Sequence, residues 1–385
     1  MDEAHRCFFM NHIKECDMAK TIVGLNDPKA VKKYSGQLAV DIARTSYFSK
    51  KFMGEGESAS TPVQILRNLE NDAGEQITYD LSLQLKMQPV EGDEVLEGQE
   101  EDLKFATDNV YINQMRQGVN AGGRMTRKRT LHDLRMVAKA RQRDWWSRVM
   151  DELLFIYISG SRGENSDYTF PTSYTGFADN GITAPDSDHI LYAGSATSKA
   201  TVAATDKMTL TAVDRLCAKA TMMGGGTEGI PSIQPIVIDG EEHFVLVMSP
   251  WQKYDLKRDA GTGGWLDVQK AAAAAEGAKN PIFKGGLGMY NNVVLHEAKQ
   301  VIRYTDYGAG SNVAAARGLF MGAQAAVIAF GSAGTGMRFD WHEEMRDNGN
   351  QLVVSTNSIF GVKKCSFKSK DFGVIAVDSA AANPG

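Results

Sequence analysis

The chain has 385 residues, of which 43% are hydrophobic and 23% are charged, and its formal net charge is −5. This composition is typical of a folded protein with a substantial core, and it excludes a fibrous or largely disordered chain. The length predicts two or three compact units, and the small net charge argues against a uniformly basic surface that would bind nucleic acid.

The cysteines and the apolar segments indicate the cellular compartment in which the chain is synthesised. Most of its four cysteines lie far apart in the sequence, which favours reduced thiols and synthesis in the cytoplasm: Cys7, Cys16, Cys217 and Cys365. The first residues have mixed charge and no apolar core, so we expect no secretory signal. The uncharged run 318–337 is long enough to span a membrane, but its glycines and Gln324 favour a buried strand or helix, and we expect no membrane segment.

The first 60 residues read as an arm with one helix. Pro28 follows Asn26 and Asp27 at a break, after which apolar residues recur at helical spacing through Val31, Leu38, Ile42 and Tyr47. Met18 is a second possible initiator, because the helical period becomes regular only after it.

The next segment predicts a long hairpin. Residues 76–87 alternate apolar and polar positions, which indicates a half-buried strand, and a second alternating run passes through Val110, Ile112 and Met115. The loop between them holds seven acids and no base: Glu91, Asp93, Glu94, Glu97, Glu100, Glu101 and Asp102. We expect this acidic tip to stand away from its own core.

A long helix is predicted after the hairpin. Thr130 and Asp133 resemble a capping-box start, apolar residues hold one face from Leu131 to Ile156, and Gly160 ends the pattern. At 1.5 Å per residue this helix would be roughly 42 Å long, which predicts an elongated, flat subunit. Residues 124–148 also carry nine Lys or Arg against two Asp.

The remainder predicts an α+β unit followed by returning strands. Residues 161–207 are rich in small polar residues and predict long loops. Helices are expected at 210–223, from 250 and at 265–276, and strands at 233–238, 243–248, 293–296, 301–304 and within 318–330. The strands after residue 338 are expected to return and pack with the long helix.

No catalytic or metal-binding pattern stands out. His5, Cys7, His12 and Cys16 are metal-competent but lack a zinc-site spacing, and His342-Glu343-Glu344 lacks a second His and predicts a surface strand end. The glycine-rich stretches 224–227 and 285–288 predict turns rather than nucleotide loops. We therefore expect no catalytic residue, cofactor or metal.

The charge blocks carry the remaining signal. Both could simply be solvated surfaces. The sharper hypothesis is that the acidic tip of one subunit meets the basic helix of another, because a hairpin leading into the helix points away from it. The expected basic partners are Arg127, Lys128, Arg129, Arg135, Lys139, Arg141 and Arg143. Each exposed pair would contribute about 0.2–1 kcal/mol and set register more than affinity.

This order of elements resembles the HK97-like major capsid proteins of tailed bacteriophages, and several motifs resemble the N4-type phage capsid family. The motifs are residues 27–36 (DPKAVKKYSG), 47–50 (YFSK), 244–252 (FVLVMSPWQ), 280–283 (NPIF), 288–291 (GMYN), 294–297 (VLHE) and 359–364 (IFGVKK). They cover the chain from about residue 27 to residue 376.

The resemblance implies an α+β, HK97-like capsid fold. The implied parts are an N-terminal arm (1–61), an E-loop hairpin with flanking strands (62–123), a P-domain with the spine helix (124–207 and 336–385) and an A-domain (208–335). It also implies assembly as hexamers and pentamers into an icosahedral virion shell around double-stranded DNA. A portal and scaffold or decoration proteins would be further partners, and assembly would take place in the host cytoplasm.

Some members of the resembled group join a hairpin Lys to an Asn of a neighbour. No Lys or Arg lies between residues 88 and 102 here, so we expect non-covalent assembly. Two alternatives stay open at this point. One is the shell of an encapsulin-type nanocompartment, which would enclose enzymes, and the other is a soluble α+β enzyme.

Overall fold

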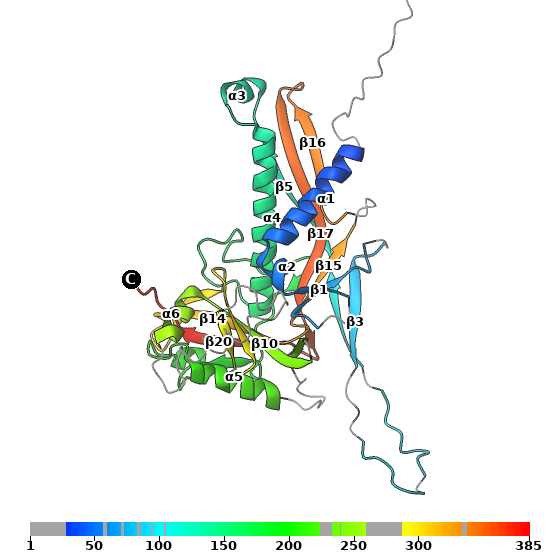
Figure 1. The fold of residues 1–385 in the computed structure, drawn as a ribbon, viewed down its shortest axis with the longest axis vertical. Helices are drawn as coiled ribbons and strands as arrows, with labels where there is room; N and C mark the ends of the chain where they lie inside the picture. The colour runs from blue at the N-terminus through cyan, green and yellow to red at the C-terminus, as the bar shows by residue number, and fades with distance from the viewer. Residues whose placement is uncertain are drawn as a thin grey trace, which may run out of the picture.

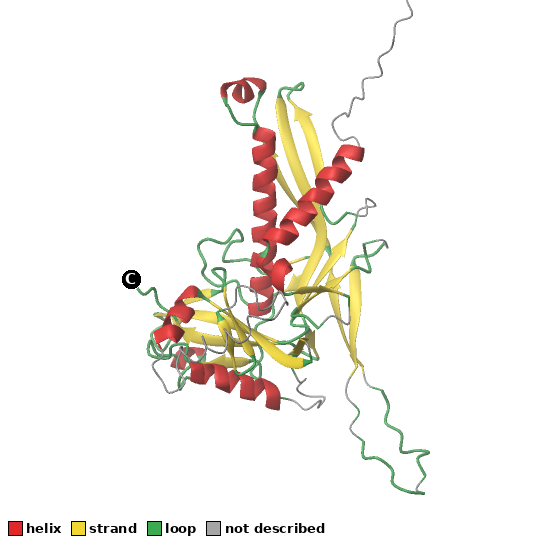
Figure 2. Cartoon of the chain, in the orientation of Figure 1, coloured by secondary structure: helices red, strands yellow, loops and turns green. Residues whose placement is uncertain are grey.

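The computed structural model describes residues 28–385 except 57–59, 71–72, 83–84, 86, 94, 104, 224–232, 239, 259–286 and 333–336. The described residues form an elongated molecule with one sheet beside a long helix and a second sheet in a wider body at the end of that helix (Figure 1). A hairpin projects from the opposite side of the first sheet, beyond the second sheet (Figure 2). The elongated shape predicted from the long helix is therefore present.

The long helix is α4, Leu134–Ser159, and its 26 residues span about 39 Å at 1.5 Å per residue. Its end agrees with the prediction. Gly160 caps the helix in a left-handed conformation with φ 68°, a geometry that glycine adopts without strain. From Val149 to Ser159 every residue of the helix is buried, which explains why apolar residues there depart from a single stripe.

The predicted start of this helix at Thr130 is wrong. Thr130 instead ends a separate short helix, α3 (Arg124–Arg129). The N-cap of α4 is Asp133, whose carboxylate accepts hydrogen bonds from the backbone N–H groups of Arg135 and Met136. An aspartate that satisfies these two donors is a stronger helix start than a threonine three residues earlier, so the chain breaks between the two helices.

The sheet beside α4 has six strands in the order β1-β2-β15-β17-β16, with β5 also paired to β17. Its strands are β1 (Met53–Glu55), β2 (Val63–Leu66), β5 (Asn113–Asn120), β15 (Ala326–Gly331), β16 (Asp340–Arg346) and β17 (Gln351–Lys364). β17 runs antiparallel to β5, β15 and β16 and packs against α4. The predicted return of the C-terminal segment to the long helix is confirmed for β17, while β16 reaches α4 through the ion pair of Glu343 with Arg135.

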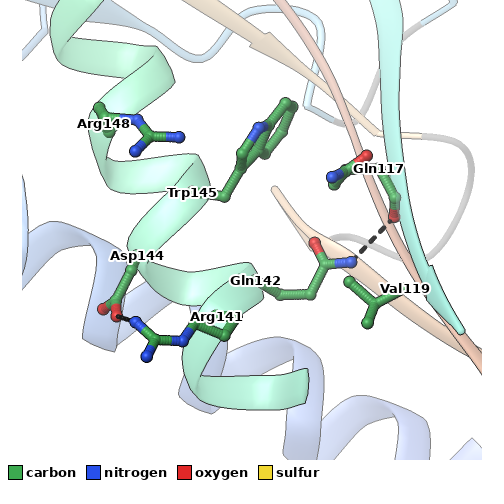
Figure 3. A pocket seen from close by; sticks show the side chains of 7 residues that line it. All are labelled: Gln117, Val119, Arg141, Gln142, Asp144, Trp145 and Arg148. Carbon is green, nitrogen blue, oxygen red and sulfur yellow. Dashed lines mark hydrogen bonds and ion pairs between the residues drawn. The ribbon is translucent and has the colours of Figure 1, made fainter. Parts of the chain in front are cut away.

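A buried polar chain fixes α4 on this sheet. Trp146 Nε1 donates to Thr356 Oγ1 at 2.7 Å, and that hydroxyl donates to Gln142 Oε1 at 2.6 Å. The Gln142 amide in turn donates to the backbone oxygen of Gln117 on β5 at 3.2 Å (Figure 3). Each of these hydrogen bonds is directional. Together they fix the rotation of the helix over the sheet more strictly than apolar contacts would.

The arm helix is α1 (Pro28–Thr45), which packs on both α4 and β16 through the buried side chains of Leu38 and Ile42. The predicted helix is confirmed, but it does not reach Tyr47. Tyr47 begins the short helix α2 (Tyr47–Lys51), which turns the chain toward β1.

Asp151 of α4 holds the start of α2. One carboxylate oxygen accepts from the Ser46 hydroxyl at 2.7 Å and from the Phe48 N–H at 3.1 Å, and the other accepts from the Tyr47 N–H at 2.8 Å. Burial raises the pKa of Asp151 to about 6, while these three donors act in the opposite direction. At neutral pH the carboxylate is therefore ionised and fully hydrogen-bonded.

We expect Asp151→Ala to lower the free energy of unfolding of the unassembled subunit by about 2–4 kcal/mol, because it leaves several buried donors without an acceptor. Urea unfolding at neutral pH measures the loss. Asp144→Ala is the control, since that carboxylate is 46% exposed and its ion pairs contribute little. Equal effects of the two substitutions would refute the capping role.

The hairpin is formed by β3 (Gln76–Ser82) and β4 (Phe105–Tyr111), which pair antiparallel over their whole length. The predicted first strand, 76–87, is too long. Its regular pairing ends at Ser82, and Leu85 and Met87 are 63% and 50% exposed. Beyond Ser82 the apolar side chains of the pattern are therefore left uncovered by the part of the subunit that the structure describes.

The predicted second strand of the hairpin is two strands. β4 ends at Tyr111, and β5 leaves the hairpin to pair with β17. At the end of β4 the backbone oxygen of Tyr111 passes close to Gly361 on β17. A Cβ on that glycine would lie 1.9 Å from the oxygen, so no larger residue fits there. The hairpin is thereby anchored in the six-stranded sheet.

The second main sheet has eight strands in the order β11-β12-β10-β14-β20-β8, with β13 on β14 and β9 on β10. Its strands are β8 (Ile190–Tyr192), β9 (Ile236–Ile238), β10 (Glu241–Met248), β11 (Gly288–Tyr290), β12 (Val293–Glu297), β13 (Arg303–Tyr307), β14 (Val313–Met321) and β20 (Val374–Ala380). Helices α5 (Leu210–Met222) and α6 (Pro250–Arg258) belong to the same body. These helices and the β9–β10 hairpin were predicted, whereas the helix expected at 265–276 lies outside the described residues.

Two strands lie in a different sheet from the one expected. β15, placed with the α+β unit from sequence, joins the six-stranded sheet, because the run 318–330 is divided near Gly322 rather than continuous. β20, expected to return to the long helix, pairs with β14 in the eight-stranded sheet. All seven residues of β20 are buried, as in a strand covered on both faces.

Short elements complete the fold. They are β6 (Gly176–Phe177), β7 (Asn180–Gly181), the 3₁₀ helix η1 (Lys199–Thr201), β18 (Ser366–Phe367) and β19 (Lys370–Asp371). Among the helices of the described ranges, none combines the length and the apolar character needed to cross a membrane.

A buried arginine of the eight-stranded sheet, Arg317, joins the two main bodies. Arg317 of β14 binds both carboxylate oxygens of Asp378 on β20, each at 2.7 Å, and Tyr307 also donates to Asp378 at 2.7 Å. The same guanidinium donates to the backbone oxygen of Ser159, the last residue of α4, at 2.9 Å. The long helix is thus tied directly to the centre of the eight-stranded sheet.

Candidate assembly surfaces

The acidic loop stands clear of the subunit, as the sequence predicts. It lies at the far end of the hairpin, beyond the eight-stranded sheet (Figure 1). Glu101 is half-buried and Glu94 lies outside the described residues, whereas the other acids of the loop are exposed: Glu91, Asp93, Glu97, Glu100 and Asp102.

The loop has local order. The Gln99 N–H donates to the Leu96 oxygen at 2.9 Å and closes a turn in which Gly98 has φ 87°, as a type II turn requires. Gly98 also donates to the Glu100 carboxylate at 2.7 Å, and Glu101 accepts from the Met87 N–H across the loop at 2.8 Å. These bonds place Glu97 at the corner of the turn.

The hairpin exposes apolar side chains as well as acids. The exposed fractions are 63% for Leu85, 50% for Met87, 67% for Val95, 59% for Leu96, 64% for Leu103 and 57% for Phe105. Six large apolar residues on one protruding element form the kind of surface that another chain covers.

The basic residues expected to face this hairpin are used differently. Five of them contact groups of their own subunit: Arg135 pairs with Glu343 at 2.7 Å, Arg143 with Asp144 at 2.8 Å, Lys139 with Gln37 at 2.8 Å, Arg127 with the Asn350 backbone at 3.1 Å, and Arg141 more loosely with Asp144 at 3.9 Å. Lys128 and Arg129 on α3 are exposed, and the side chain of Arg141 is 77% exposed. The last three are therefore the cations best placed for another subunit.

The end of the molecule around α3 also exposes apolar residues. The exposed fractions are 62% for Met125, 103% for Leu131, 61% for Met136 and 43% for Val137. This end and the acidic loop carry opposite charge beside exposed apolar side chains, and they lie at opposite ends of the molecule (Figure 1). The two surfaces therefore cannot meet within one subunit.

The prediction for residues 342–344 is partly wrong, and two other predictions concern residues that the structure does not describe. His342-Glu343-Glu344 is not wholly a surface strand end, since Glu343 is 5% exposed and accepts from Trp341 Nε1 at 2.8 Å as well as binding Arg135. The partners of Glu343 lie on α4 and on β16 itself, so its buried carboxylate links the helix to this strand. His5, Cys7, His12, Cys16 and the glycines at 224–226 and 285–286 lie outside the described residues.

The described residues hold no cluster of three or more His, Cys, Asp or Glu side chains that could bind a metal. Cys217 and Cys365 are free thiols, and burial raises the pKa of both, that of Cys365 to about 12. Both are thus protonated at neutral pH and unsuited to act as nucleophiles.

The buried charges that join α4 to its neighbours were not predicted from the sequence. Asp151, Arg317 and Asp378 each interrupt an apolar run, and Lys364 pairs with Asp371 at 2.7 Å in the interior. A charge that interrupts an apolar segment is a usable signal, because such residues are rarely buried without a partner. The identity of the partner is not visible from the sequence.

A model of a protein family described as phage capsid protein matches residues 22–383. The chain belongs to this family. The capsid protein is 49% identical to the chain solved in the capsid of Ralstonia phage GP4, with a TM-score of 0.83 over 95% of this chain and 99% of that one. It is also 28% identical, over 88% of its length and 92% of the relative's, to the major capsid protein of Pseudomonas phage KPP25.

A more distant likeness supports the fold alone. The capsid asymmetric unit of cyanophage Pam1 matches with a TM-score of 0.67 at 22% identity, over 89% of this chain and 93% of that one. The predicted α+β, HK97-like fold is confirmed. The capsid protein is a shell component of a virion, and the matched proteins are phage capsids rather than nanocompartment shells.

Proposed function

We propose that the chain is a structural, non-catalytic subunit that assembles as hexamers and pentamers into an icosahedral shell around the double-stranded DNA of a tailed phage. Family membership and the likeness to the Ralstonia phage capsid support this proposal. So does the shape of the subunit, whose long helix and projecting hairpin suit overlapping contacts in a shell. The net charge of −5 suits a shell to which DNA must not adhere tightly.

The acidic hairpin of one subunit contacts the basic face of a neighbour's α3 and α4. The observation that carries this is the placement of two oppositely charged, partly apolar surfaces at opposite ends of one subunit. The acids are Glu91, Asp93, Glu94, Glu97, Glu100, Glu101 and Asp102, and the bases are led by Lys128, Arg129 and Arg141. Apolar burial supplies most of the affinity, and the charges set the register.

The parts of the subunit follow the HK97-like division. Residues 1–61 act as the arm, 62–123 as the E-loop region, 124–207 with most of 336–385 as the P-domain, and 208–335 as the A-domain. Two exceptions follow from the sheets, because β20 pairs in the A-domain sheet and β15 in the P-domain sheet. Each domain therefore contains strands that lie far apart in sequence.

Further partners follow from the same function. A portal occupies one vertex, scaffold or decoration proteins bind the shell, and the packaged DNA is held without sequence preference. Assembly takes place in the host cytoplasm and is non-covalent, since residues 88–102 offer no amine.

Light scattering and electron microscopy of the purified full-length chain test this function. We expect closed particles of uniform size when protein concentration is raised, and nuclease-resistant double-stranded DNA inside particles purified from infected cells. A chain that stays monomeric in all solution conditions, and is absent from such particles, would contradict the proposal.

A further inference from the structure

The backbone of Tyr111, at the end of the hairpin strand β4, is held by a side chain from another part of the fold. The amide oxygen of Asn180 accepts from the Tyr111 N–H at 3.0 Å, and the amide nitrogen donates to the Tyr111 oxygen at 2.8 Å. Asn180 is 3% exposed, so water competes little for these two bonds. The side chain binds β4 at the point where the chain leaves the hairpin for β5.

Asn180 belongs to the β6–β7 turn, residues 176–181, whose position is fixed by α4 and β17. The Tyr157 hydroxyl of α4 donates to the backbone oxygen of Asn180 at 2.7 Å and accepts from the Phe177 N–H at 2.6 Å. The Phe177 ring packs on Phe360 of β17, with 5.0 Å between ring centroids. Asn180 therefore connects the end of β4 to the long helix and to the six-stranded sheet.

The β6–β7 turn is strained. Ala178 and Asp179 have φ angles of 58° and 56°, in the left-handed region that both central residues of a type I′ turn adopt. Asn-Gly is the favoured pair at these positions, and Ala178 is the one apolar residue among the described non-glycine residues with positive φ. Its side chain cannot form the local hydrogen bond that helps Asn and Asp to adopt this region. Such strain persists only while the surroundings hold it, and it is common in segments that switch.

The hairpin is joined to the rest of the subunit in a way that allows it to change direction. In the part of the chain that the structure describes, β3 and β4 form a sheet of their own, and Ile112 lies between β4 and β5 without belonging to either. The base of the hairpin packs in a small apolar cluster that is separate from the main core, and Asp108 pairs with Lys363 at 2.5 Å. Changes in hairpin direction should therefore concentrate at residues 111–113.

We propose that the β6–β7 turn is a releasable catch that sets the direction of the projecting hairpin. While Asn180 binds Tyr111, the hairpin keeps the direction seen in Figure 1. When the strained turn relaxes, Asn180 withdraws, and β3 and β4 turn together about residues 111–113. In the proposed shell this adjustment lets one chain fit rings of five and of six subunits. That use rests on the proposed function, whereas the catch is a property of the single subunit.

Distance measurements on the unassembled, full-length subunit test the catch. Spin labels at positions 97 and 242, both exposed, report on the hairpin tip and the eight-stranded sheet. A ketone-bearing amino acid carries each label, so that the native cysteines do not react. The unsubstituted subunit should give one narrow distance distribution, and Asn180→Ala should widen it about twofold or more, as release of a hinge does.

Asn165→Ala is the matched control. Asn165 is 1% exposed and also binds backbone groups, donating to the Val301 oxygen at 3.0 Å and accepting from the Arg303 N–H at 2.8 Å. Its partners lie at the eight-stranded sheet, so the two substitutions should lower the thermal unfolding midpoint similarly, and only Asn180→Ala should widen the distance distribution. An unchanged distribution in Asn180→Ala, or equal widening by Asn165→Ala, would overturn the catch.

Hydrogen exchange of the Tyr111 amide tests the role of strain with milder variants. Asn180→Asp places a carboxylate oxygen against the Tyr111 oxygen, and the amide should exchange about tenfold faster. Ala178→Asn with Asp179→Gly supplies the favoured turn pair, and the amide should exchange more slowly than in the unsubstituted subunit. Unchanged or faster exchange in this turn variant would show that strain does not open the catch. Neither measurement uses particles, so its failure would leave the proposed shell function untouched, and a failure to assemble would leave the catch untouched.

Discussion

Replacing Glu97, Glu100, Glu101 and Asp102 together by lysine is expected to abolish particle formation and to leave the subunit folded. Three of these acids are exposed and Glu101 is half-buried, so the folded subunit loses little. Each pair with a neighbour contributes about 0.2–1 kcal/mol, and reversal adds repulsion of similar size. Every 1.4 kcal/mol lost at a contact lowers its affinity tenfold. Four reversed charges at each contact therefore weaken it by more than a shell held together by weak contacts tolerates.

Sedimentation velocity distinguishes particles from free subunits in this experiment. The matched comparison is Glu97→Lys/Glu100→Lys against Glu241→Lys/Glu242→Lys, which changes the net charge equally at exposed acids of the β9–β10 hairpin. Assembly should fail in the first variant and persist in the second. Equal yields from both would show that the acidic loop has no part in assembly.

The largest loss of stability is expected for Arg317→Met. The substitution leaves the carboxylate of Asp378, which is fully buried, with the Tyr307 hydroxyl but without its guanidinium partner. Breaking one side of a buried ion pair costs about 3–5 kcal/mol. Urea unfolding of the unassembled subunit should show this loss, and assembly should fail because α4 is no longer tied to the eight-stranded sheet.

Two further variants separate the ion pair from its neighbourhood. Arg317→Met/Asp378→Leu removes both charges and should recover part of the lost stability, since an apolar pair needs no desolvation. Lys199→Met breaks an ion pair with Asp306 in which both side chains are about half exposed, and it should cost less than about 1 kcal/mol. A double variant less stable than Arg317→Met alone would argue against this explanation.

Elements governed by local rules were predictable from the sequence. The stop of α4 at Gly160, the helix α5 and the β9–β10 hairpin depend on a cap, a period and a turn, and each is present. The start of α4 was misplaced because two residues three positions apart, Thr130 and Asp133, both suit an N-cap. The side chain of Asp133 accepts the N–H groups of Arg135 and Met136 in the first turn of α4, whereas that of Thr130 accepts only the N–H of His132, which precedes the helix.

Sheet membership depended on contacts between distant segments. Nothing in the alternation of β17 specifies that β15, rather than another apolar strand, lies beside it. Likewise, the run 318–330 reads as one apolar segment, and its division follows from a crossing at Gly322, where a Cβ would lie 2.3 Å from the Gln234 oxygen. Such close approaches are properties of the packed chain.

The charge of the two candidate surfaces was predictable from the sequence, but the residues that remain exposed on them were not. The acids of the loop could be placed because the alternating strands on either side require a hairpin. The bases could not be sorted, since the pairing of Arg135 with Glu343 and of Lys139 with Gln37 joins residues far apart in sequence. The exposed apolar residues of the loop, among them Val95 and Leu96, complete the surface that charge alone suggested.

Electron cryomicroscopy of assembled particles, at a resolution that shows side chains, tests the central claim most directly. The account predicts that the loop of residues 88–102 of each subunit lies on the α4 face of a different subunit, with its acids beside exposed arginines. A loop that lies in solvent, or folds back on its own subunit within an otherwise closed shell, would contradict it.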